Sequence, residues 1–199
     1  MDIQNLSEAQ EILTFWFDDP SIPDSAYGQQ RKIWFRKDAR FDQHVRDRFL
    51  ATYQRARQGE FDTWLEQPRA ALALTVLLEQ CPRNFFRGTA RCFEADAQAL
   101  AAADVAITRQ HDLALLPVER MFLYLPFEHS ENIEHQQRAV SLFETLVRSA
   151  PEFQSTLDYA YRHRDVIGQF GRFPHRNDSL QRQSTAAEIL FLKQPGARF

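Results

Sequence analysis

The strongest constraint on the fold of this chain is that its apolar residues recur every three to four positions, between short breaks that contain proline or glycine. A clear case places Phe41, Val45, Phe49 and Tyr53 four residues apart. This spacing puts their side chains on one face of an α-helix. No segment alternates apolar and polar residues for long enough to predict a β-strand. The sequence therefore predicts an all-α fold.

One predicted helix stands out because it is apolar on nearly all sides. It begins at Pro68, which suits the first turn of a helix, and remains apolar through Leu78. A helix of this kind belongs in the centre of a domain, so the stretch from Ala70 to Leu78 is expected to be the most buried element. Because proline lacks a backbone N–H, the helix is expected to end before Pro82.

Capping signals set the limits of several other helices. Ser7, Ser130 and Thr185 each resemble an N-cap, and Gly171 resembles a C-terminal stop. The predicted helices lie in the ranges 7–18, 68–81, 89–110, 117–125, 131–150, 152–170 and 186–193. Two more are predicted, one that carries Ile33, Trp34 and Phe35 and one that carries Phe41 to Tyr53 and stops at Gly59. We therefore expect eight to ten helices in a single domain over residues 1–199, packed as successive antiparallel pairs.

Composition and charge exclude several classes of protein. With 199 residues, of which 44% are hydrophobic, the chain is long enough to bury a sizeable core. Its longest apolar stretches are too short to span a membrane. A net charge of −3 argues against nucleic-acid binding. Six acidic residues precede the first basic one, Arg31, which does not fit a secretory signal, so we expect a cytoplasmic protein.

Three segments marked by proline are too rich in Arg, His and Asn to be simple connections. They span residues 79–89, 125–131 and 170–177, and each combines aromatic with polar side chains. Binding sites often form in such segments because a rigid scaffold can hold their polar groups in place. We therefore expect the three segments to converge around one cavity.

The residues in these segments also carry a resemblance to a known family. The chain resembles the bacterial domain of unknown function 924 family, whose members look like tetratricopeptide-type helical proteins. The resemblance rests on Phe15-Trp16-Phe17, Trp34-Phe35, Pro82-Arg83-Asn84, Arg87-Gly88-Thr89, Leu125-Pro126-Phe127, His129-Ser130-Glu131, His163-Arg164, Phe170-Gly171-Arg172-Phe173-Pro174-His175-Arg176-Asn177 and Ser184-Thr185. Glu79 and Cys81 stand where the family usually has Asp and an apolar aromatic residue. The resemblance implies a tetratricopeptide-like superhelical domain and no particular activity.

The predicted helix before Gly171 contains a charge on its apolar side. Arg164 falls on the stripe formed by Leu157, Ala160, Tyr161 and Ile167. A charge that faces the core is costly unless it is paired. Arg164 is therefore expected to be mostly buried against a carboxylate, helix-end carbonyls or an anionic ligand.

Together these residues predict a polar pocket for a small anionic metabolite, a carboxylate or a phosphate. Guanidinium groups clamp such anions, histidine transfers protons near neutral pH, and amides stabilise a developing oxyanion. The expected catalytic residues are His129, Glu131 and His175, and the expected ligand-binding residues are Arg83, Asn84, Arg87, His163, Arg164, Arg172, Arg176 and Asn177.

A second interpretation is a structural polar network that ties helix ends together, in a protein that binds peptides or other proteins through a concave helical surface. Whether the chain is an enzyme is left open by these alternatives. No metal or other cofactor is predicted, because Glu131 and His135 share a helix face but the zinc-protease pattern is absent. Cys81 and Cys92 are expected to be buried thiols.

Overall fold

A computed structural model of the chain describes residues 3–197, with side chains from residue 7 onward. Helices and their connections make up these residues, which contain no β-strand, so the predicted all-α fold is confirmed. The α-helices are α1 (Ile3–Phe17), α2 (Ala39–Arg57), α3 (Pro68–Phe85), α4 (Asp96–Thr108), α5 (Pro117–Glu128), α6 (Ile133–Ser149), α7 (Gln154–Phe170) and α8 (Ala186–Phe191). Short 3₁₀ helices lie at Lys32–Trp34, Asp62–Glu66, Ala90–Phe93, His111–Ala114, Pro151–Phe153 and Pro174–Arg176.

The chain folds as two compact units. Unit 1 contains the described residues up to Arg87 together with Arg91–Pro126. Unit 2 contains Gly88–Ala90 and the described residues from Phe127 onward. The expectations of a single domain over residues 1–199 and of a tetratricopeptide-like superhelix stay predictions. Within residues 3–197, no helix combines the length and the apolar character needed to cross a membrane.

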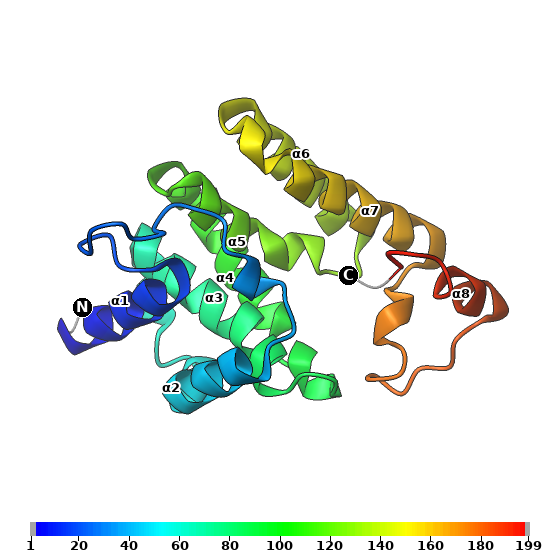
Figure 1. Cartoon of the computed structure of the whole chain (residues 1–199), viewed down its shortest axis with the longest axis horizontal. Helices are drawn as coiled ribbons and strands as arrows, with labels where there is room; N and C mark the ends of the chain where they lie inside the picture. Colours follow the sequence, from blue (N-terminus) through cyan, green and yellow to red (C-terminus); the bar gives the residue numbers. More distant parts are fainter. Residues whose placement is uncertain (1–2, 198–199) are drawn as a thin grey trace. The chain divides into compact units, whose positions relative to one another are not determined.

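Unit 1 is built around α3, as predicted. This helix packs against α1, α2 and α4 (Figure 1). Every residue from Ala70 to Pro82 is buried, and the side chain of Leu77 is fully enclosed. Beside it, the ring of Phe122 from α5 makes edge contacts with Trp16 and Trp34. The centre of unit 1 therefore combines aliphatic packing along α3 with an aromatic cluster.

The prediction that α3 ends before Pro82 is wrong, because the helix continues to Phe85. Pro82 falls in the last turn, where the loss of one backbone hydrogen bond leaves the rest of the helix intact. The Phe86 N–H donates to the Pro82 carbonyl at 2.9 Å and closes the helix end. Pro126 behaves alike, since it lies inside the last turn of α5, which continues past the predicted end at Leu125.

Unit 2 contains the hairpin of α6 and α7, followed by a loop and the short helix α8 (Figure 1). Only a short 3₁₀ connection separates α6 from α7, so these packed neighbours are antiparallel. A small core around Val166, Ile167 and Phe173 joins α7 to the loop that follows it. Phe170 and Phe191 cover this core at its edge.

The capping predictions have mixed outcomes. Gly171 ends α7 in a left-handed conformation with φ of 67°, and Thr185 forms a capping box with Glu188, as predicted. Ser7 lies inside α1, so it is not an N-cap. Ser130 does not cap α6 either, because Asn132 accepts hydrogen bonds from the first-turn amides.

Candidate functional site

Residues 79–87 of the first predicted segment belong to unit 1, where Arg83 is engaged with two carboxylates. Its guanidinium lies 3.0 Å from Glu79 and 2.8 Å from Asp96. The contact with Asp96 is bidentate, and a further guanidinium bond reaches the Glu79 carbonyl at 2.5 Å. Bidentate pairing of this kind fixes both the distance and the orientation of the two groups. Arg83 therefore joins the end of α3 to the start of α4.

Asn84 and Arg87 share one carboxylate on α2. Asp42 accepts two hydrogen bonds from Arg87 and one from Asn84, each at 2.7 Å. Partial burial acts to raise the pKa of Asp42, but these hydrogen bonds outweigh it and lower the pKa. Because the charge of Arg87 is already balanced by Asp42, these contacts support a structural role for both predicted ligand-binding residues.

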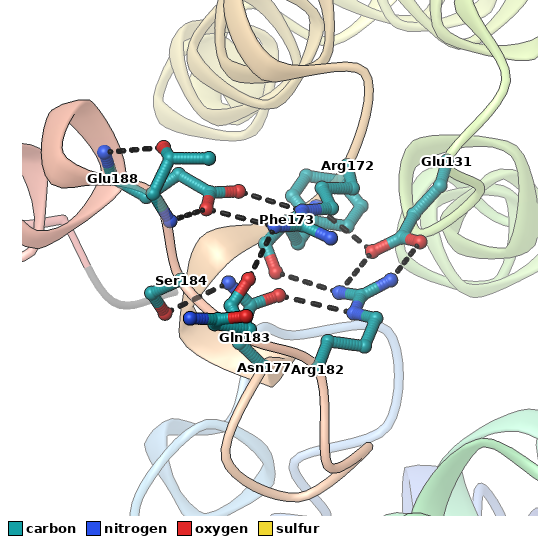
Figure 2. Close-up of polar contacts among 9 residues, drawn as sticks. Glu131, Arg172, Phe173, Asn177, Arg182, Gln183, Ser184 and Glu188 are labelled. Atoms are coloured by element: carbon teal, nitrogen blue, oxygen red, sulfur yellow. Dashed lines mark hydrogen bonds and ion pairs between the residues drawn. The ribbon is translucent and has the colours of Figure 1, made fainter.

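The second and third predicted segments come together within unit 2, at Glu131. One oxygen of Glu131 accepts the Phe173 N–H at 2.8 Å, and Arg182 donates to both oxygens at 2.6 and 2.9 Å (Figure 2). Partial burial acts to raise the pKa of Glu131, but the bonds from Arg182 and the Phe173 amide outweigh it and lower the pKa. The carboxylate predicted to assist a catalytic histidine thus holds the loop in place.

Arg172 is paired with the first turn of α8. It donates to both oxygens of Glu188, at 2.6 and 2.8 Å, and to the Gln183 carbonyl at 2.9 Å (Figure 2). The hydrogen bond from Arg172 lowers the pKa of Glu188 to about 2, against the opposing effect of burial and with help from the Thr185 amide. This pair fastens the loop after α7 to α8.

Asn177 is likewise held inside the loop. Its amide group donates to Ser184 at 3.0 Å, and its oxygen accepts from Arg182 at 3.0 Å (Figure 2). Arg182, the centre of this network, was not predicted, because it lies in an aperiodic polar stretch whose sequence carries no pairing signal. Arg172 and Asn177 therefore belong to a network that sets the loop conformation.

The prediction that Arg164 faces the core is wrong. Its side chain is 36% exposed and pairs at 2.7 Å with the neighbouring Asp165, which is itself 66% exposed. The expected carboxylate partner is present, but it lies at the surface. The buried ionisable residue on α7 is the preceding one, His163, at 3% exposure. The orientation of α7 therefore differs from the predicted one by about one residue, so that His163 faces the core and Arg164 lies nearer the surface.

Three of the four remaining predicted residues lie around the ring of Phe173, which is fully buried. His163 and His175 lie with ring centroids 5.4 and 5.6 Å from it. The guanidinium carbon of Arg176 lies 4.5 Å from the same ring, and His129 lies 5.8 Å from His163. We call His129, His163, His175 and Arg176 the histidine cluster.

His163 is held at the centre of this cluster. Its Nδ1 lies 2.8 Å from the Tyr159 carbonyl and 3.2 Å from Glu128. Burial lowers the pKa of His163 well below its usual value, and the nearby His129 and Arg176 lower it further, although the Tyr159 carbonyl acts in the opposite direction. The ring is therefore neutral near pH 7, and its Nδ1–H is directed at these oxygens.

Glu128 is the member of the site that the sequence did not reveal. It is the last residue of α5 and is 4% exposed. A carboxylate that directly follows the apolar run of residues 121–127 is expected to be buried and to need a partner, and this is the sequence signal that could have revealed it. Gln136 from α6 holds the local backbone, donating to the Glu128 carbonyl at 2.5 Å and the Ser130 carbonyl at 2.7 Å.

These features define an all-helical protein with a histidine-rich polar cluster at helix ends and in the loop after α7. The chain belongs to the family described as "Bacterial protein of unknown function", DUF924, which it matches over residues 12–196. It is similar to the solved structure of a protein of unknown function from Agrobacterium tumefaciens. The two are 43% identical with a TM-score of 0.82, over 95% of this chain and 98% of that one. No curated protein matches this chain.

Proposed function

We propose that the histidine cluster of unit 2 binds a small anionic molecule, a carboxylate or a phosphate. The observation that carries this proposal is the placement of Arg176. This cation is 7% exposed and stacks on Phe173 within a group of three imidazoles. A guanidinium in such surroundings presents planar N–H donors that match the oxygens of a carboxylate or phosphate.

The electrostatic surroundings support an anion at this place. Burial is the main cause that lowers the pKa of His163, and the positive charge of Arg176 lowers it further. A positive potential that disfavours protonation of His163 favours a bound anion, because both effects arise from the same positive charge. Imidazole N–H groups would add hydrogen bonds to the anion.

The proposal is limited to binding. Glu131 is occupied by Arg182 and the Phe173 amide, so the predicted trio of His129, Glu131 and His175 does not form an acid–base relay through that carboxylate. The pairs that hold Arg83, Arg87 and Arg172 fit the alternative interpretation of a structural network. The two interpretations therefore apply to different residues.

Thermal unfolding of metal-free protein with inorganic phosphate, succinate or citrate would test the proposal, at matched ionic strength against chloride. Anions that bind the native state raise its melting temperature. We expect a rise for at least one of these anions, its loss in Arg176→Met, and its retention in Arg148→Met, which removes an exposed arginine of the same unit. A rise that survives Arg176→Met, or none in the unmodified protein, would contradict the proposal.

A further inference from the structure

A group of side chains that can bind a metal ion lies near Arg176, where the last residue of α5 meets a histidine of α7. Glu128, His129 and His163 each offer one ligand atom, and these atoms lie within 4.8 Å of one another. Glu128 and His163 are buried, whereas His129 is partly exposed. Two imidazoles and one carboxylate are a ligand set that proteins use for Zn²⁺ and other divalent first-row metal ions.

The spacing of these atoms is close to what a metal ion requires. Ligands about 2.0–2.2 Å from a tetrahedral Zn²⁺ lie about 3.4 Å from each other. The widest separation of 4.8 Å needs an inward shift of well under 1 Å per ligand, within reach of a small side-chain rotation.

Hydrogen bonds with neighbouring residues hold the backbone and the ring of His163 around this group. The Gln136 amide binds the carbonyls of Glu128 and Ser130, which flank His129 on both sides. The Tyr159 carbonyl lies 2.8 Å from the ring of His163. Such outer contacts orient metal ligands in known sites, and they reduce the entropy that binding would otherwise cost.

The donor set of the cluster also suits a metal ion. The Nδ1–H of His163 is directed at the Tyr159 carbonyl, 2.8 Å away, which places the lone pair on the other ring nitrogen, the one that can coordinate a metal. The carboxylate of Glu128 would supply the negative charge that partly balances a divalent cation.

We propose that Glu128, His129 and His163 form a binding site for one divalent transition-metal ion, with Zn²⁺ as the fitting case. Three protein ligands leave a fourth coordination position, which in zinc sites of this type is taken by water or by an oxygen of a small molecule. The site does not depend on the proposed anion binding. The charge of Arg176 opposes a cation at this place, and the carboxylate of Glu128 would offset it.

The test uses protein freed of metal with a chelator, in chloride buffer without phosphate or carboxylates. Titration calorimetry with Zn²⁺ should show one equivalent bound. Titration with Co²⁺ should give the visible absorption of a low-symmetry cobalt site. A sulfur-to-cobalt charge-transfer band should be missing, since the buried Cys81 and Cys92 take no part.

Substitutions identify the ligands. His129→Gln and His163→Gln should each weaken binding by more than about 100-fold, because removing a ligand costs more than removing an outer contact. The control His44→Gln, on the exposed side of α2, should bind as the unmodified protein does. Circular dichroism checks that each variant is folded. His129 is partly exposed, so its substitution keeps the test decisive if His163→Gln unfolds.

No Zn²⁺ binding by the metal-free protein would overturn the proposal. Equal binding by the unmodified protein and folded His129→Gln would do so too, since the ion would then be held elsewhere. Because these titrations contain no test anion, and the anion measurements use metal-free protein, either proposal can fail without the other.

Discussion

Replacing Arg182 with alanine should destabilise unit 2 more than any surface substitution. Its guanidinium donates to both oxygens of Glu131, to the Asn177 side chain at 3.0 Å and to the Phe173 carbonyl at 3.0 Å. The side chains of Arg182 and Glu131 are only 23% and 27% exposed. Without Arg182, the Glu131 carboxylate keeps one hydrogen bond, from the Phe173 amide.

The expected loss follows from these contacts. The two bonds to Glu131 are charge-assisted and contribute about 1 kcal/mol each after allowance for partial exposure, and the two bonds to neutral oxygens contribute about 0.5 kcal/mol each. The poorly solvated carboxylate left behind adds to this sum. We therefore expect Arg182→Ala to lower the free energy of unfolding by about 2–4 kcal/mol.

Urea unfolding followed by circular dichroism would measure this loss, with Arg148→Ala as the matched surface control expected to change stability by less than about 0.5 kcal/mol. A double-mutant cycle with Glu131→Gln should give a coupling energy of about 1 kcal/mol or more. If Arg182→Ala costs no more than the control, the network around Glu131 does not hold the loop, and our reasoning about it is refuted.

Three further predictions follow from the fold. Leu77→Ala should lower the free energy of unfolding by about 2–5 kcal/mol in urea titrations, because it leaves a cavity beside a fully buried position of α3, and a loss under about 0.5 kcal/mol would contradict that position. The pKa of Glu188 falls from its ordinary value of 4.5 to about 2, so its pairing with Arg172 should stabilise the protein fully above pH 4.5 and be lost as the pH drops towards 2. Melting temperatures between these pH values should therefore fall more steeply for the unmodified protein than for Glu188→Gln, and parallel curves would exclude the pair as a source of stability. Gly171→Ala should lower the free energy of unfolding by about 1 kcal/mol. The cost comes from the left-handed backbone alone, because no atom beyond the adjacent residues lies within 4 Å of the added Cβ. A melting temperature equal to that of the unmodified protein would show that the turn relaxes.

The amino-acid sequence by itself determined the helical fold and the most buried element. Four-residue spacing predicted α2, and the apolar run after Pro68 predicted the burial of α3. The stop at Gly171 and the capping box at Thr185 were also predictable. Each of these features depends on residues within a few positions of each other, so its physical cause can be recognised in the local sequence.

Tertiary structure decided how the charges are paired and where two helices end. Pro82 and Pro126 both signalled a break, but each lies in a last turn, where packing of the whole helix outweighs one missing hydrogen bond. The partner of a charged side chain is equally undetermined by local pattern. Arg164 and His163 occupy adjacent positions on α7, and only the packing of neighbouring elements decides which of them is buried.

The candidate site illustrates the same division. Its histidines were predicted from their unusual surroundings in the sequence, whereas Glu128 was found only through its contact with His163. A carboxylate at the end of one helix and an imidazole in the middle of another share no sequence spacing. They meet only in the folded protein, where both side chains are buried and lie 3.2 Å apart, and burial removes the water that would otherwise solvate both groups.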